Sequence, residues 1–123
     1  MPRGYRPRCT PGGVPAQPVS ALAHPADDVR RLREGRLSAD DALVTLCLAP
    51  RGNQFATMEV TEQDWRLAAE LGLRISCHAG DGEWGKNRPV AQLAQHGLLG
   101  PTITFVHCNT LADDELAMMA DAG

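Results

Sequence analysis

The chain has 123 residues, a net charge of −3 and a pI near 5.7. This length allows one domain with a modest core, and it is half of the roughly 250 residues that a complete eightfold β/α barrel needs. The acidic balance argues against nucleic acid or anionic lipid as a partner, and no apolar run reaches the roughly 20 residues of a membrane span.

Residues 1–26 are rich in proline and glycine, a composition that sustains neither helix nor strand, so we expect an irregular arm there. The domain then spans residues 27–123. Its first element is a short helix over 27–34, with acidic residues first, arginines later and Gly35 as terminator.

Residues 42–49 form a nearly continuous apolar run, which predicts a strand covered on both faces in a parallel sheet. A capping-box-like start at Thr61 predicts a helix with Trp65, Ala68, Ala69 and Leu71 on its apolar face, and Gly72 stops it.

Two further strand patterns follow, over residues 73–77 and 102–106. Between them lies a glycine-rich loop and a helix opened by Pro89, and after them a helix over 112–122 with Leu116, Met119 and Ala120 as its apolar positions. This order predicts an α/β fold with about three parallel strands and flanking helices, either part of a (β/α)8 barrel or an open sheet. No glycine-rich phosphate loop follows a strand, so nucleotide binding lacks support.

His78 and His107 each end one of these strands, 29 residues apart. Because the carboxyl ends of parallel strands meet at one edge, we expect the two imidazoles to share a site there. Imidazole is a common zinc ligand and a proton carrier near neutral pH. The alternative is that both are ordinary polar residues at strand ends.

The four cysteines show no CxxC spacing. Cys47, Cys77 and Cys108 lie in or beside strand patterns, so we expect reduced, buried thiols. The arginine-rich start is followed by proline and glycine instead of a hydrophobic signal-peptide segment, so we expect a cytoplasmic location. A nucleophilic role for Cys77 or Cys108 remains the alternative.

The segments LGLRISCHAGDGEWG and VAQLAQHGLLGPTITFVHCNTLADDELAMMADAG resemble the middle of a metal-dependent amidohydrolase, in the cytosine/guanine deaminase and triazine-hydrolase-like branch. That resemblance implies a distorted (β/α)8 TIM-type barrel with an HxH pair after its first strand, histidines after the fifth and sixth, and an aspartate after the eighth. Only the fifth- and sixth-strand motifs occur here, which implies a partial barrel over residues 27–123.

By the same resemblance, His78 is a ligand of a divalent metal, zinc in the first place and iron in the second, and His107 contacts the attacking water or the substrate. A bound metal makes hydroxide available near neutral pH. Asp81 stands where the family has a proton-shuttling glutamate, and its alternative role is that of an Asx-turn residue. Trp84 is either a pocket wall or a packing anchor.

We therefore expect a fragment of a metal-dependent hydrolase acting on non-peptide carbon–nitrogen bonds, inactive alone. The intact family would take a small-molecule substrate, and the fragment would self-associate or need a complementing chain. The alternative is a non-catalytic α/β binding module or truncated pseudoenzyme.

Overall fold

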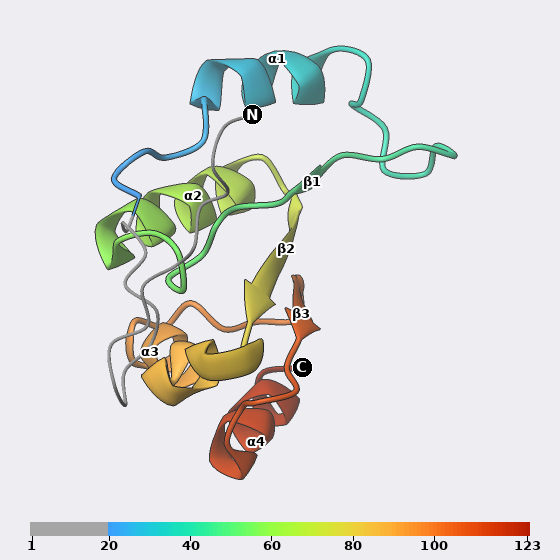
Figure 1. Ribbon diagram of the computed structural model, residues 1–123. Coiled ribbons are helices and arrows are strands. Elements are labelled where there is room, and N and C mark those ends of the chain that lie inside the picture. Colours follow the sequence, from blue (N-terminus) through green and yellow to red (C-terminus); the bar gives the residue numbers. More distant parts are fainter. Residues whose placement is uncertain (1–19) are drawn as a thin grey trace, which may run out of the picture.

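The computed structural model describes residues 20–123 (Figure 1). Most of the expected irregular arm, residues 1–19, lies outside the described residues. The elements are α1 (Ala26–Glu34), β1 (Cys47–Leu48), α2 (Met58–Glu70), β2 (Arg74–Ala79), the 3₁₀-helix η1 (Gly82–Asn87), α3 (Pro89–Gln95), β3 (Ile103–His107) and α4 (Asp113–Ala122).

The three strands form one open sheet in the order β1-β2-β3, and both neighbouring pairs are parallel. The β2–β3 register pairs Ile75 with Ile103 and Ala79 with His107. Each crossover between neighbouring strands contains a helix, as parallel connections require. The expected α/β class with three parallel strands and flanking helices is therefore confirmed, and it is consistent with part of a TIM-type barrel.

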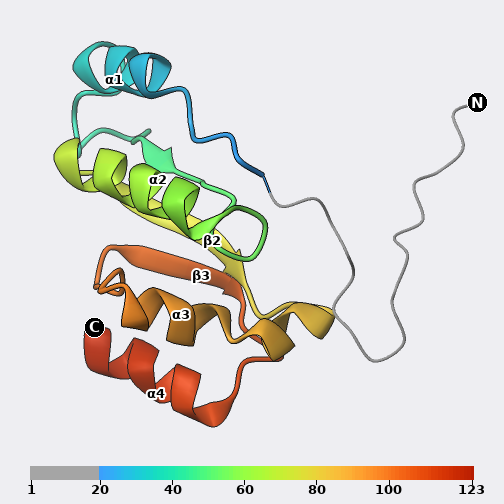
Figure 2. The same ribbon diagram turned by 90° about the vertical axis from the view of Figure 1, so that its left-hand side faces the viewer.

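One face of the sheet is buried under helices. Figure 2 shows α2 and α3 in front of the strands, with α4 beside α3. Along β2 the side chains alternate, so Ile75, Cys77 and Ala79 are buried whereas Arg74 and His78 are exposed. The core that these helices complete consists of Val29, Leu48, Trp65, Leu67, Ala68, Leu73, Ile75, Cys77 and Leu93.

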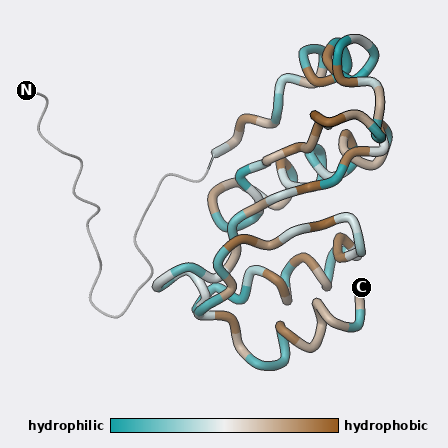
Figure 3. The backbone as a smooth tube through the Cα atoms, turned by 90° about the vertical axis from the view of Figure 1, so that its right-hand side faces the viewer, coloured by the Kyte–Doolittle hydropathy of each residue, from teal (hydrophilic) through white to brown (hydrophobic). Residues whose placement is uncertain are grey.

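The opposite face of the sheet is open in the described part of the chain, which corrects the expectation of strands covered on both sides. Figure 3 shows that hydrophobic (brown) and hydrophilic (teal) residues are mixed along the backbone. The helices of residues 20–123 that contact the sheet gather on one side, so only every second strand residue finds a core partner.

The expected strand over residues 42–49 is wrong in its length, since only Cys47 and Leu48 pair with β2. Leu43 and Val44 are 103% and 66% exposed. The cause is geometric: β2 begins at Arg74, opposite Cys47, so the residues before Cys47 have no strand beside them among those described. Cys47 is likewise exposed instead of buried.

The helix boundaries agree with the sequence at α1 and α3 and differ at α2. Thr57, in extended conformation, is the N-cap, and its side chain accepts a hydrogen bond from the Val60 N–H at 3.2 Å. Thr61 is buried one turn inside the helix, where its hydroxyl donates to the Thr57 carbonyl at 2.9 Å. Ala69, expected on the apolar face of this helix, is exposed, and Leu67 is buried.

The apolar face expected for α4 is wrong at two of its three positions, since Met119 is half-buried. Leu116 and Ala120 are exposed, and the fully buried side chain is Glu115. Its Oε1 accepts from the N–H groups of Val90 and Ala91 at 3.0 and 3.1 Å, at the N-terminus of α3. A carboxylate there satisfies unpaired helix donors and complements the helix dipole, so burial of this charge is compensated. No helix in the described residues is long and apolar enough to cross a membrane.

Candidate functional site

His78 and His107 lie next to each other at the carboxyl edge of β2 and β3. Their rings are stacked, with centroids 4.9 Å apart and planes inclined by 28°. Both residues are exposed on the open side of this edge. The structure thus brings together the two imidazoles that the sequence places at the ends of neighbouring strands.

The approach of His107 to His78 depends on an unusual backbone conformation. The register pairs His107 with Ala79, whose side chain is buried on the helical side of the sheet. Strict alternation would therefore send the His107 side chain to that same side. Instead, φ is +81° at His107 and +61° at Cys108, two consecutive non-glycine residues in the left-handed region. Conformations of this kind are concentrated at functional sites, where surrounding contacts hold them.

Asp81 lies in the loop after β2, half-buried, and is tied to Gln54 in the loop after β1. The Gln54 side-chain amide donates from Nε2 to Asp81 Oδ1, and its Oε1 accepts from the Gly80 N–H at 2.9 Å. Asp81 is the N-cap of η1, yet its side chain makes no capping bond. Its carboxylate is therefore used for the contact with Gln54 and not for the turn.

Gln54 is the main site residue that the sequence does not single out. It is a polar residue in a polar loop, with nothing in its spacing to distinguish it. Only the fold reveals that it is 5% exposed and hydrogen-bonded at both ends of its amide. The weak signal available was its place just beyond a strand, at the edge where parallel sheets bind ligands.

The loops after all three strands are joined through Gly80. Its carbonyl accepts from the Thr110 hydroxyl at 2.7 Å and from the Thr110 N–H at 2.9 Å. On the other side, the Phe55 ring meets Trp84 edge-to-face, with centroids 5.0 Å apart. Trp84 therefore acts as a packing anchor for the loop after β1. The glycine-rich loop is not irregular throughout, since residues 82–87 form η1.

The cysteines beside the histidines are poorly suited to nucleophilic chemistry. Burial raises the pKa of Cys77 to about 12, with a smaller contribution from the nearby Cys108. Desolvation also raises the pKa of the Cys108 thiol. Both thiols are thus protonated near neutral pH, when a nucleophile needs the thiolate.

The remaining histidines pair with carboxylates of α2. The His24 N–H donates to Asp64 Oδ1 at 2.8 Å, and its ring Nδ1 lies 3.4 Å from Oδ2. His96 Nδ1 lies 2.7 Å from Glu62 Oε1. The sequence suggests an ordinary surface role for His24, but His24 is the partner of Asp64, which is only 3% exposed and needs a hydrogen-bond donor.

A complete metal centre does not form from residues 20–123 alone. No group of three or more His, Cys, Asp or Glu side chains in this part of the chain is arranged to hold a metal ion. Catalytic zinc sites commonly use three protein ligands and keep one position open. His78 and His107 supply two imidazoles, so they fit part of such a ligand set and not the whole.

Comparison with known proteins finds relatives whose names state an activity. The chain is 30% identical over 92 aligned positions to a 5'-deoxyadenosine deaminase of Methanopyrus kandleri. The alignment covers 68% of this chain and 21% of that protein. It is 32% identical over 127 aligned positions to 5-methylthioadenosine/S-adenosylhomocysteine deaminases of Nitratidesulfovibrio vulgaris strains DP4 and Hildenborough, covering 94% of this chain and 28% of each relative.

These relatives are deaminases. Their similarity supports the amidohydrolase-type deaminase resemblance; their names mention adenosine compounds and not cytosine, guanine or triazines. The chain spans between 21% and 28% of the length of these curated relatives. No family model matches the chain, and no solved structure matches it.

Proposed function

We propose that this chain supplies the fourth to sixth β/α units of a metal-dependent deaminase, and that it is not catalytic by itself. In this proposal His78 is one ligand of a divalent metal, with zinc first and iron second. His107 contacts the attacking water or the substrate. The other ligands come from outside residues 20–123, either from a longer form of the protein or from a complementing chain.

The observation that carries this proposal is the stacked pair of imidazoles, 4.9 Å apart, at the carboxyl edge of two parallel strands. In parallel α/β folds this edge is where catalytic residues gather. The left-handed backbone at His107 supports a functional reading, because a strand-end histidine with no partner to meet has no need of that conformation.

The substrate class in the proposal is a small aminated heterocycle, with amino-purine nucleosides first because of the names of the relatives. Asp81 is the proton carrier. Its carboxylate belongs to the same carboxyl edge as the histidines, and it is held there without being used as a helix cap. We further propose the cytoplasm as the location, since Cys47, Cys77 and Cys108 are free thiols.

The test begins with the DNA on both sides of the reading frame, which should encode an upstream HxH strand and a downstream strand ending in aspartate. The resulting longer protein is then produced with zinc, and ammonia release is measured from adenosine, 5'-deoxyadenosine and 5'-methylthioadenosine. We expect activity in the longer protein, loss in His78→Ala and His107→Ala, and no loss in His96→Ala. Flanking DNA without these elements, or full activity in His78→Ala, would contradict the proposal.

A non-catalytic binding module is the second candidate, and the exposed sheet favours it. The outer edges of β1 and β3 have no strand partner in the described residues, and Leu43 and Val44 are exposed beside β1. Unpaired strand edges readily add another strand. If the 123-residue chain is a stable monomer that binds no zinc, and the flanking DNA lacks the missing elements, this candidate replaces the enzyme.

A further inference from the structure

We infer that Gln54 is a positioning residue that fixes Oδ1 of Asp81 and leaves Oδ2 as the oxygen that carries the proton. This inference rests on the proposed function, because it assigns the proton-carrying atom of the same site. Its basis is the pair of hydrogen bonds at the two ends of the Gln54 amide.

The orientation of the Gln54 amide follows from its partners. The Gly80 N–H can only donate, so the atom that faces it at 2.9 Å must be the carbonyl oxygen Oε1. The amide nitrogen Nε2 then necessarily points to Asp81 Oδ1, and an NH₂ group can only donate there. Because Gln54 is 5% exposed, water does not compete freely for either bond.

The two oxygens of Asp81 consequently differ. Oδ1 accepts from Gln54, and a proton placed on Oδ1 would weaken it as an acceptor for that bond. Oδ2 has no such contact among the described residues and is free to take a proton. The carboxyl group therefore keeps its orientation in both the charged and the protonated form. An aspartate without a hydrogen bond to one of its oxygens would be free to rotate.

Deamination of an amino-heterocycle needs such a carrier. The water oxygen bonds to the ring carbon, the carbon–nitrogen bond breaks, and the two protons of the water end on a ring nitrogen and on the departing ammonia. Oδ2 of Asp81 accepts each proton and gives it up again, so the carboxylate is regenerated in every cycle. An orientation error of about 1 Å in such a group costs on the order of 100-fold in rate.

The backbone around Asp81 is built to hold this arrangement. The Gly80 carbonyl receives two hydrogen bonds from Thr110, and its N–H goes to Gln54, so the residue before Asp81 is fixed from both sides. Gly85 in η1 lies against the Thr110 carbonyl, so closely that a Cβ there would overlap it. Gln54 thus completes a loop structure that three strand ends share.

The decisive variant is Gln54→Glu, which keeps an acceptor for the Gly80 N–H and replaces the donor to Asp81 by a second carboxylate. In the longer zinc-loaded protein we expect kcat to fall about 10–100-fold with KM changed less than about threefold, because Gln54 orients the proton carrier without touching substrate. Gln63→Glu makes the same chemical change on the exposed side of α2 and should leave both constants unchanged. A kcat within twofold of the wild type in Gln54→Glu would overturn the inference.

A second measurement separates the inference from the proposed function. Nuclear magnetic resonance of the 123-residue chain should show Gln54 side-chain NH₂ protons that exchange more slowly than those of Gln63, and Asp81→Ala, which removes the acceptor, should reduce the difference. The Gly80 amide should stay protected in Gln54→Glu and lose protection in Gln54→Leu. Rapidly exchanging Gln54 protons in the wild type would overturn the inference even in an active deaminase. If the longer protein is no deaminase, the role of Oδ2 is overturned although the hydrogen bonds are found.

Discussion

Gly80 lies against Leu111 with no room for a side chain. A Cβ on Gly80 would be 2.6 Å from both Cγ and Cδ2 of Leu111, and φ at Gly80 is +68°. We expect Gly80→Ala to destabilise the fold by about 2–4 kcal/mol, from overpacking and the left-handed backbone together. Urea denaturation measures this loss.

Gly82→Ala is the matched control. Gly82 also has positive φ, +52°, but a Cβ there would meet no atom within 4 Å. Only the backbone cost of about 1–2 kcal/mol should appear. Equal losses in the two variants would show that Leu111 moves aside without penalty.

Glu115 provides the second prediction, since it joins α4 to the start of α3. Glu115→Ala would leave the N–H groups of Val90 and Ala91 without their acceptor in a buried place. We expect a loss of about 2–4 kcal/mol in the free energy of unfolding, measured by urea denaturation. Asp121→Asn, at an exposed position of the same helix, should change it by less than about 0.5 kcal/mol. A small loss in Glu115→Ala would mean that water reaches these donors.

Much of the fold is predictable from local sequence. The apolar patterns before His78 and His107 predict β2 and β3 close to their observed positions. Gly35 and Gly72 predict the ends of α1 and α2. These features depend on neighbours in sequence: β-branched residues favour strands, and Gly72, with φ at +62°, allows the left-handed turn after α2. The position of the two histidines at one edge then follows from parallel topology.

The remaining features depend on contacts that local sequence does not contain. The length of β1 is set by where β2 begins, and the burial of Glu115 by unpaired donors of another helix. The hydrogen-bond donor to the Asp81 carboxylate is Gln54, 27 residues away. The positive φ of His107 reverses the direction that alternation along β3 would give. Each of these was inaccessible because the deciding group belongs to a different element.

Cysteine reactivity gives a third prediction. Burial raises the pKa of Cys77 to about 12, so this thiol stays protonated at pH 8. Cys47 is exposed and Cys108 is half-buried. Among these three cysteines of the described residues, iodoacetamide should label Cys47 first, Cys108 more slowly and Cys77 last in the native chain, as read from peptide masses. In urea all three rates should converge, whereas fast native labelling of Cys77 would contradict its burial.

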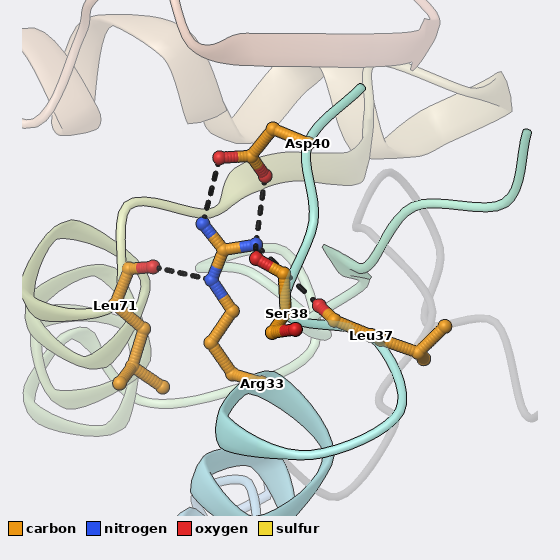
Figure 4. Close-up of polar contacts among 5 residues, drawn as sticks. All are labelled: Arg33, Leu37, Ser38, Asp40 and Leu71. Carbon is orange, nitrogen blue, oxygen red and sulfur yellow. Dashed lines mark hydrogen bonds and ion pairs between the residues drawn. The ribbon is translucent and has the colours of Figure 1, made fainter. Parts of the chain in front are cut away.

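The fourth prediction concerns pH and the Arg33 side chain, which joins α1, the following loop and α2. Figure 4 shows its guanidinium between Asp40, at 2.7 and 2.9 Å, and the Leu71 carbonyl, at 3.0 Å. The Arg33 hydrogen bonds lower the pKa of the Asp40 carboxyl below its ordinary value of 3.8. A lowered folded-state pKa means that the stabilisation is present above that value and is lost as the pH falls through the folded-state pKa.

We therefore expect the Tm to fall between pH 5 and pH 2.5, and to fall less steeply in Asp40→Asn. The neighbouring exposed Asp41→Asn should keep the wild-type slope. Part of the slope remains in Asp40→Asn, because arginines also lower the pKa of Glu70 and Asp114. Salt at 0.5 M should reduce the effect, since Asp40 is exposed and its charge is screened. If Tm fell as steeply with pH in Asp40→Asn as in the wild type, the contact between Arg33 and Asp40 would not contribute to that slope.

The last prediction tests the two imidazoles directly. In the 123-residue chain the other ligands of the proposed site are missing, so His107 is free to act as a second donor beside His78. Two imidazoles should bind zinc weakly and reversibly, because a catalytic site commonly needs three protein ligands. His78→Ala and His107→Ala should each weaken this binding about tenfold or more, measured by competition with a chromophoric chelator. His96→Ala should not change it, although His96 is also exposed and lies 2.7 Å from a carboxylate. Equal affinities in all three variants would mean that the stacked pair does not bind the metal together, and His78 would then need its other ligands before it binds at all.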